Sequence, residues 1–556
     1  MKELYGSLTG LKPNQIKRIE HLYRRRMPPS FLVTPEVAKE MAGLSHEIRR
    51  QMGILVDRSG RVTHVLVGDH DQIVIPPLEK FRAGIDRLRG LRCIHTHLSG
   101  NDLTRDDLTD LTLLRLDLMA AIDVDDAGHP ETIHAAVIQP GDIAQPYKPL
   151  SALTHADLDI DCLTQILGIE AEMARLGRIF AGDPAAERAI LVGVTTGPKK
   201  TATDSLDELS ELAQSSGIRI LDRILQVRKK IDPRFVMGKG KLNEVAISAL
   251  QMGATLIIFD RELEPAQIRS ITDRIELKVI DRTQLILDIF AQRAQTREGK
   301  LQVELAQLTY LLPRLAGKNA ALSRLAGGIG GRGPGETQLE IDRRRVRERI
   351  TRLERATRDI KKQRKQQRSR RSKRGVPVVS IVGYTNAGKS TLLNTLTQSR
   401  VTAEDRLFAT LDPSSRRIRF PRDLEVIITD TVGFIQDLPK ELMAAFRATL
   451  EELENADLLV HVIDISNPRY PEQIASVERI LADLDLHRIP TLYALNKIDQ
   501  MPDDFRVPRP WEDALTISAI DRPTLTPLLT RIETALRQSG AAGAFIPEDA
   551  APEGID

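Results

Sequence analysis

The segment GYTNAGKS, Gly383–Ser390, could bind the phosphates of a nucleotide. It follows the apolar run VVSIV, which is typical of a buried strand, and precedes TLLNTL, which has a helical pattern. A glycine-rich loop in this setting lets backbone N–H groups converge on phosphate oxygens, and the helix N-terminus adds partial positive charge. We expect Lys389 to reach the β- and γ-phosphates and the Ser390 hydroxyl to bind Mg²⁺. The predicted loop contacts are Gly383, Tyr384, Thr385, Asn386, Ala387, Gly388, Lys389 and Ser390.

The segment NKID, Asn496–Asp499, could select the base. It ends the strand-like run TLYAL. The Asp499 carboxylate can accept both the N1–H and the 2-amino group of guanine. Adenine lacks these donors and would leave the carboxylate unpaired. We expect Asn496 to brace the loops, the Lys497 stem to cover the base and the SAI segment to line it. The predicted guanine contacts are Asn496, Lys497, Ile498, Asp499, Ser518, Ala519 and Ile520.

Two segments between these motifs could act at the γ-phosphate. In DTVG, Asp430 would hold the Mg²⁺ shell and the Gly433 N–H would contact the phosphate. In FATLD, Thr410 would be a second hydroxyl ligand, ordered only when the γ-phosphate is present. We therefore predict Ser390 and Thr410 as metal ligands, and Lys389, Thr410, Asp430 and Gly433 as catalytic. The other predicted contacts here are Phe408, Ala409, Leu411, Asp412, Thr431 and Val432.

Phe434 follows DTVG, where many GTPases carry a glutamine that positions water. A phenyl ring cannot orient water, so we expect slow intrinsic hydrolysis, on the order of 10⁻⁴ to 10⁻² s⁻¹. The side-chain carbonyl of Asn386 could hold a K⁺ ion beside the phosphates. Phe434 also leaves open a different class of protein, a binding factor whose nucleotide site is only structural.

The elements that must position these residues predict an α/β protein of several domains. Residues 1–185 mix strand and helix patterns, as expected of an α+β domain. Residues 186–295 alternate apolar runs with amphipathic stretches, which predicts a small parallel α/β domain. Residues 374–540 predict a phosphate-loop domain with a mostly parallel sheet and flanking helices. Residues 541–556 are small and acidic and predict a disordered tail.

Residues 296–373 predict an antiparallel helical hairpin. On its first arm Leu301, Leu305, Leu308, Leu312 and Leu315 have the spacing of a helix–helix seam, and on its second arm Leu339, Val346, Leu353 and Ile360 recur every seven residues. The segment GGIGGRGPGETQLE, residues 327–340, would form the tip. A simple helix-stopping linker is the alternative, but six glycines exceed what a turn requires, and Arg332 and Glu336 stand among them.

The second arm is strongly basic. From Arg343 to Arg374 the chain has seventeen Lys/Arg and three Asp/Glu. A solvated, charge-balanced helix face is the alternative, but such a face needs counter-charge. We expect a surface for a nucleic-acid backbone, with RNA as the polymer.

The composition excludes several classes of protein. The 556 residues include two cysteines, Cys93 and Cys162, so we expect neither a disulfide framework nor a cysteine-based metal site. No apolar run approaches the roughly 18 residues of a membrane span, and the N-terminus has no signal-peptide core. We expect a cytoplasmic monomer with no membrane contact.

Taken together, these motifs resemble the HflX family of ribosome-associated GTPases. The resemblance covers about 190–535 and rests on GKLQVELAQLTYLLPRL, GGIGGRGPGETQLEIDRRR, VGYTNAGKSTLLN, LFATLDP, DTVGFIQDLP and NKID, with MGKGKLNEV and KVIDRTQLILDIFAQRAQT upstream. It implies hydrolysis of GTP with Mg²⁺, and binding of the 50S subunit with the hairpin tip (residues 327–335) and the basic arm (residues 339–374) on rRNA. It also implies splitting of 70S ribosomes under stress. The rival reading within this resemblance is a hibernation or RNA-remodelling factor. Family members also bind ATP, for which GKGK, Gly238–Lys241, could touch phosphate.

Residues 94–107, IHTHLSGNDLTRDD, resemble the metal-binding signature of JAMM/MPN-like metalloproteases. The resemblance implies that His95, His97 and Asp107 could bind zinc and that Glu47 is the general base. The match departs from the signature because Thr104 replaces a serine and the spacing is one residue short. We therefore expect a metal-free domain used for binding, rather than an active peptidase.

Overall fold

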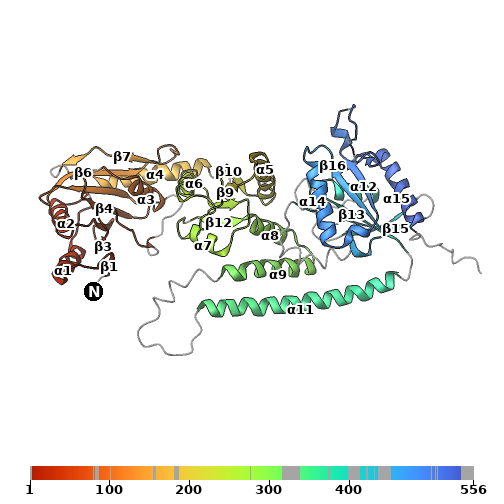
Figure 1. Ribbon diagram of the computed structural model, residues 1–556, viewed down its shortest axis with the longest axis horizontal. Helices are drawn as coiled ribbons and strands as arrows, with labels where there is room; N and C mark the ends of the chain where they lie inside the picture. The colour runs from red at the N-terminus through yellow and green to blue at the C-terminus, as the bar shows by residue number, and fades with distance from the viewer. Residues whose placement is uncertain are drawn as a thin grey trace, which may run out of the picture. The chain divides into compact units, whose positions relative to one another are not determined.

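A computed structural model describes residues 3–29, 31–78, 81, 87–100, 102–154, 158–180, 187–275, 277–315, 338–372, 376–397, 414–420, 424–430, 433–435, 453–502, 504–507, 509 and 511–539 (Figure 1). The chain folds as two compact units. The first comprises Met1–Thr203, Ile218–Ile258 and Ser270–Val279. The second comprises Asp204–Gly217, Phe259–Arg269 and Ile280–Asp556. Across the described residues, no helix is long and apolar enough to cross a membrane.

The N-terminal sheet has eight strands in the order β1-β3-β2-β4-β5-β6-β7, with β8 paired to β6. Its strands are β1 (Leu4–Gly6), β2 (Met52–Asp57), β3 (Val62–Val67), β4 (Leu91–His97), β5 (Leu118–Val124), β6 (Pro130–Ile138), β7 (Tyr147–Pro149) and β8 (Leu153–Thr154). Its helices are α1 (Pro13–His21), α2 (Pro35–Ile48), α3 (Arg105–Leu113) and α4 (Cys162–Phe180). Strand β4 runs parallel to β5 and antiparallel to β2, which confirms the mixed α+β architecture.

Every residue of β4 and β5 is buried, because helices cover both faces of this part of the sheet. Successive side chains of a strand point to opposite faces. The Thr96 hydroxyl bonds Ser45 of α2, whereas His95 and His97 face Asp107 of α3. Helices α2 and α3 therefore pack on opposite faces of β4.

A second sheet has four strands in the order β10-β9-β11-β12. Its strands are β9 (Arg188–Thr195), β10 (Arg219–Val227), β11 (Leu256–Phe259) and β12 (Lys278–Asp281), and its helices are α5 (Lys199–Ser215), α6 (Lys239–Gln251), α7 (Pro265–Thr272) and α8 (Arg282–Arg293). Strands β9 and β10 pair in parallel. The alternation of strands and helices is the small α/β arrangement that the apolar runs predict.

The hairpin helices are α9 (Arg297–Arg314) and α11 (Gln338–Ser372), which lie side by side (Figure 1). Leu353 of α11 is buried and Val346 and Ile360 are half-buried, as the heptad spacing predicts. The five leucines of the seam predicted on α9 are partly buried, like Val346 and Ile360, and Gln302, Val303, Ala306 and Tyr310 are buried. Helix α9 also packs against α8, so it has two covered faces. The glycine-rich tip, residues 316–337, lies outside the described residues.

The third sheet has six strands in the order β14-β15-β13-β16-β17-β18. Its strands are β13 (Val378–Gly383), β14 (Ser414–Arg419), β15 (Glu425–Asp430), β16 (Leu458–Asp464), β17 (Thr491–Asn496) and β18 (Leu515–Thr516), and its helices are α12 (Lys389–Thr397), α14 (Tyr470–Asp483) and α15 (Thr526–Gln538). Short 3-10 turns are η1 (Leu22–Arg24), η2 (Leu453–Asn455), η3 (Leu486–Arg488), η4 (Ile498–Gln500) and η5 (Arg522–Leu525).

In this third sheet β15, β13, β16 and β17 are parallel neighbours, and only β14 is antiparallel. The carboxyl ends of parallel strands lie at one edge of a sheet, where ligands bind in open α/β folds. Gly383, Asp430 and Asn496 end β13, β15 and β17. The topology therefore brings the predicted phosphate, metal and base motifs to the same edge.

Candidate functional site

The phosphate loop is tied to the base-selecting segment by Asn496, which is 1% exposed. Its Nδ2 donates to the Ala387 carbonyl oxygen and its Oδ1 accepts from the Ala519 N–H, both at 2.8 Å. Gly388 has φ +91, and a Cβ there would lie 2.2 Å from Asn496 Nδ2. Glycine is required at this position because the side-chain amide of Asn496 lies where a Cβ would be. This is the bracing geometry expected of Asn496.

The Lys389 side chain is buried inside the loop, where its Nζ donates to the Tyr384 carbonyl oxygen at 2.6 Å. Burial lowers the pKa of Lys389 to about 8, against the opposing charge of Asp430. A Cβ on Gly433 would lie 3.0 Å from Lys389 Nζ, so a larger residue would crowd the amine. An anion beside this amine would favour its charged form. The site is therefore built to receive negative charge.

A hydroxyl and a carboxylate, from Ser390 and Asp430, lie next to this amine. The Ser390 hydroxyl donates to Asp430 Oδ2 at 2.7 Å, across the ends of α12 and β15. Hydroxyl and carboxylate oxygens suit Mg²⁺, which keeps several waters and uses few protein ligands. The residues present thus fit the ion that the sequence predicts. Phe408, Ala409, Thr410, Leu411, Asp412, Thr431 and Val432 lie outside the described residues.

Phe434 is bonded to the phosphate loop through its backbone. Its side chain is buried, its N–H donates to the Gly383 carbonyl at 3.1 Å, and its carbonyl accepts from the Thr385 N–H at 2.7 Å. The ring is therefore part of the core and the backbone is part of the loop scaffold. That Phe434 does not position water stays a prediction.

A buried polar chain reaches the loop from α5, and the sequence did not predict it. The Tyr384 hydroxyl donates to Glu208, whose other oxygen accepts from Arg282. Arg282 also donates to Asp260 at 2.9 Å. Burial would lower the pKa of Arg282, but the two carboxylates raise it, so the guanidinium stays charged. The only available signal was Glu208 itself, a charge among the buried Leu206, Leu209 and Leu212 of α5.

The end of the site that is predicted to bind guanine is exposed. Asp499 lies exposed on η4, directly after β17, and the Ile520 side chain is 74% exposed. Lys497 has a positive φ of 65 and its ammonium pairs with Asp464 at 2.7 Å, so its stem is held in place. Ser518 is buried beside Ala519. The structure thus brings the residues predicted to contact guanine together around the end of β17.

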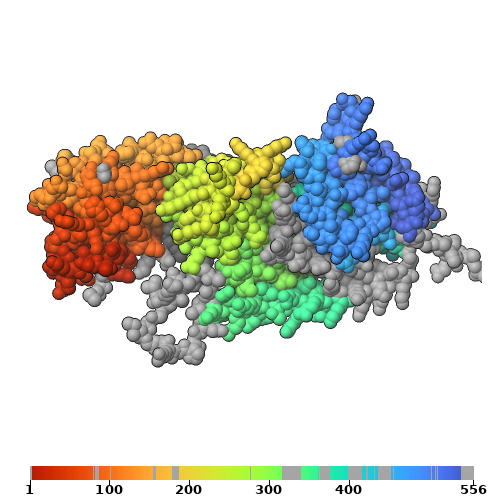
Figure 2. Space-filling model, in the orientation of Figure 1, coloured from red at the N-terminus to blue at the C-terminus, as the bar shows by residue number. Residues whose placement is uncertain are grey.

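The described part of α11 presents a basic, solvent-exposed surface. The side chains of Arg345 and Arg352 are 72% and 70% exposed, and their ion pairs on the helix have lengths of 3.9 Å. Arg349 makes the short contact, 2.7 Å to Glu304 of α9. Long exposed ion pairs contribute little. The side chains of Arg345 and Arg352 are therefore only weakly held on the helix, and Figure 2 shows α11 at the surface on this face of the molecule.

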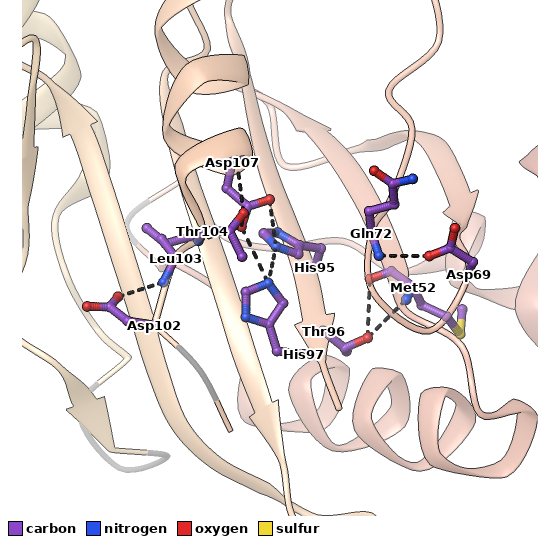
Figure 3. A network of polar contacts seen from close by, with 10 residues as sticks. All are labelled: Met52, Asp69, Gln72, His95, Thr96, His97, Asp102, Leu103, Thr104 and Asp107. Atoms are coloured by element: carbon purple, nitrogen blue, oxygen red, sulfur yellow. Dashed lines mark hydrogen bonds and ion pairs between the residues drawn. The ribbon is translucent and has the colours of Figure 1, made fainter. Parts of the chain in front are cut away.

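The structure also brings His95, His97 and Asp107 together on β4 and α3 (Figure 3). Burial would raise the pKa of Asp107, but hydrogen bonds from His95 and His97 hold it well below its ordinary value. Glu47 is not among these three residues, and its role as general base stays a prediction. Its carboxylate bonds Arg18 and Gln15 of α1, because α2 turns that side chain towards α1.

Three family models match consecutive segments of the chain. They are described as GTP-binding GTPase N-terminal (residues 203–291), GTP-binding GTPase Middle Region (residues 293–371) and 50S ribosome-binding GTPase (residues 378–497). The chain is 47% identical over 352 residues to "GTPase HflX" of Alkalihalophilus pseudofirmus, covering 63% of this chain and 83% of that protein. It is 50% identical over 319 residues to "GTPase HflX" of Escherichia coli, covering 57% and 75%.

Among solved structures, a GTP-binding protein from Sulfolobus solfataricus in complex with GDP aligns with 63% of this chain and 99% of that chain. The identity is 24% and the TM-score is 0.36, too low to transfer structural detail.

Proposed function

Because this chain belongs to the HflX GTPase family and is itself a GTP-binding GTPase, we propose that it binds the large ribosomal subunit in a nucleotide-dependent way. The observation that carries the proposal is the exposed basic helix α11, which ends six residues before the first strand of the GTPase sheet. A positively charged helix of this kind binds phosphate backbones largely independently of the nucleotide sequence. The family model described as a 50S ribosome-binding GTPase supports rRNA as the polymer.

The proposed roles within the nucleotide site rest on the sequence motifs, with support from the geometry of the described residues. Lys389 and the loop amides would bind the β- and γ-phosphates, and Ser390 with Thr410 would hold Mg²⁺, with Asp430 in its outer shell. The ion would neutralise charge on the transferring phosphoryl group. Gly433 would place its N–H at the γ-phosphate. In these roles the residues would position the phosphates and stabilise their charge, so the catalysis proposed for this site is positioning and electrostatic stabilisation.

Asp499 would choose guanine through two hydrogen bonds. Replacing it with asparagine presents a donor to the position of the 2-amino group, where xanthine has an oxygen instead. We expect Asp499→Asn to lose GTP affinity by roughly 10²-fold or more and to gain XTP affinity. Competition of GTP and XTP for a fluorescent GDP analogue measures this, and an unchanged order of preference would remove Asp499 from the site.

Binding of the GTP form to the 50S subunit would compete with the contacts between the 50S and 30S subunits. The free energy of binding the protein to the 50S subunit would then split 70S ribosomes. Hydrolysis would then favour release. GTP and Mg²⁺ would order the loop around Thr410, and this ordering would distinguish the GTP-bound state from the GDP-bound state. The full domain division, 1–185, 186–295, 296–373, 374–540 and the tail 541–556, is part of this proposal, as are a cytoplasmic location and a monomeric state.

A second candidate function is a ribosome-binding hibernation or RNA-remodelling factor, which the burial of Phe434 favours. Single-turnover GTP hydrolysis with and without 50S subunits separates the two. We expect stimulation by 50S subunits, because a partner would supply what Phe434 lacks. Equal rates would favour the binding-only factor.

Sucrose-gradient sedimentation of 70S ribosomes with the protein tests the ribosome proposal. With a non-hydrolysable GTP analogue we expect 50S and 30S peaks and co-sedimentation of the protein with 50S, and with GDP much less of each. The double variant Arg345→Glu/Arg352→Glu should lose co-sedimentation. Arg509→Glu, at an 88% exposed arginine outside the hairpin, is the matched control and should retain it. Equal behaviour of the two variants would refute the role of α11.

A further inference from the structure

The Tyr384 side chain leaves the phosphate loop and ends on a charged group of another helix. Its hydroxyl donates to Glu208 Oε1, and Glu208 Oε2 accepts from the Arg282 guanidinium. Tyr384 directly follows β13, Glu208 lies on α5 and Arg282 begins α8. Glu208, Arg282 and Tyr384 are 3%, 7% and 8% exposed. Three segments that are far apart in the sequence therefore meet in one buried line of polar contacts.

The backbone of the same tyrosine orients Lys389. The Lys389 Nζ donates to the Tyr384 carbonyl oxygen at 2.6 Å, and both residues are buried. An ammonium has three donors, so this bond fixes where the amine lies and leaves two N–H groups for other acceptors. The position of residue 384 thus sets the position of the amine that is expected to bind the β- and γ-phosphates.

The ion pair behind Tyr384 is better explained by orientation than by stability. The desolvation of two buried charges offsets most of their attraction, so replacing such a pair with well-packed apolar residues is often neutral or stabilising. Glu208 lies among buried leucines of α5, where an apolar side chain would pack well. The carboxylate instead provides a charged acceptor at a fixed point, because Arg282 is itself bonded to Asp260 at 2.9 Å. Hydrogen bonds to a charged acceptor are the strong ones, so this bond constrains the tyrosine.

Helix α5 has a second attachment, which does not involve the phosphate loop. Arg469 is the residue before α14, and its Nη1 donates to the Asp204 carbonyl oxygen of α5 at 2.7 Å. Loss of this contact would loosen α5 without removing a bond to Tyr384 or Lys389. The two attachments therefore allow docking of α5 to be separated from orientation of Lys389.

We propose that Glu208 is a positioning residue of the GTPase site, which binds the Tyr384 hydroxyl and so fixes the loop residue whose carbonyl orients the Lys389 ammonium. Arg282 holds Glu208 in that role. Without the bond, phosphate binding would include the cost of ordering the loop. The inference rests on the role proposed for Lys389, and it assigns part of the affinity for GDP and GTP to residues of α5 and α8.

The affinity of full-length variants for GDP, measured by competition with a fluorescent GDP analogue, tests the inference. Tyr384→Phe removes the hydroxyl and keeps the ring, and we expect it to weaken GDP binding roughly tenfold. Glu208→Gln keeps an oxygen that can accept from Tyr384 but loses the charge, so it should have a smaller effect in the same direction. Arg469→Met is the matched control and should bind GDP as the wild type does. Circular dichroism checks folding, and Glu208→Gln decides against the same control if Tyr384→Phe unfolds.

A double-mutant cycle shows whether the effect passes through Lys389. In a Lys389→Met background, Tyr384→Phe should change GDP affinity by less than about twofold, because the carbonyl no longer orients an ammonium. Unchanged GDP affinity in Lys389→Met alone would reject the role proposed for Lys389, and this inference with it. Three results would overturn this inference alone: wild-type affinity in Tyr384→Phe, an equal loss in Arg469→Met, or a full loss that persists in the Lys389→Met background.

Discussion

Asn496→Ala is the substitution whose effect the structure defines most sharply. The side chain satisfies the Ala387 carbonyl and the Ala519 N–H, and both alanines are buried. Alanine would remove the partner that each of these two groups has in the structure. A stranded buried group costs about 1–3 kcal/mol, so the two together cost about 2–4 kcal/mol after partial relaxation.

That cost should divide between folding and nucleotide binding. The two bonds hold the phosphate loop against the guanine loop, and the nucleotide needs both loops in this arrangement. If the whole cost falls on binding, affinity for GDP drops roughly 30- to 700-fold, at about 1.4 kcal/mol for each factor of ten. Whatever part falls on folding appears as a lower free energy of unfolding of the nucleotide-free protein.

The assay therefore measures both quantities: calorimetric titration with GDP, and urea unfolding without nucleotide. Asn467→Ala is the control, because Asn467 makes a single bond to the Arg469 N–H at 2.9 Å in a partly buried turn. It should change each quantity by well under 1 kcal/mol, which is less than about fivefold in affinity. The losses in the free energy of GDP binding and in the free energy of unfolding are added for each variant. If this sum were no larger for Asn496→Ala than for Asn467→Ala, the bracing argument would fail.

Three further perturbations follow from the same contacts. The pKa of Lys389 in the folded protein, about 8, lies below its value in the unfolded chain. The nucleotide-free wild type should therefore gain stability relative to Lys389→Met as pH rises from about 8 towards 10. Thermal unfolding across that range measures the difference in stability, and a difference that does not change with pH contradicts the burial of the ammonium. Arg282→Met should lower the free energy of unfolding by about 3–5 kcal/mol, because Glu208 and Asp260 would be left as buried charges; a loss below that of Arg175→Met, at an exposed arginine, would count against it. GTP hydrolysis should be faster in K⁺ than in Na⁺ buffer, and Asn386→Ala should abolish that difference; equal wild-type rates would exclude a monovalent-cation site.

Much of the nucleotide site could be predicted from the sequence because its signals are local. A strand, a glycine-rich loop and a helix in succession define the phosphate loop, and Asn496 stands at the end of a readable strand. Parallel strands bring such ends to one edge in any sheet of this type. The HxH spacing likewise placed His95 and His97 on one face of a strand, because side chains alternate.

The partners of these residues depended on the tertiary structure. Glu208 meets Tyr384 across 176 positions of sequence, and no local pattern encodes such a pairing. The leucine spacing of α9 could not reveal that α8 covers a second face, and Glu47 could not be seen to bond Arg18 until α1 and α2 were packed together. Local chemistry, set by backbone geometry and side-chain type, was determined by the sequence itself. Which distant group satisfies a buried charge or covers a helix face was decided only when the elements packed, because those contacts come from the fold and not from neighbours in the chain.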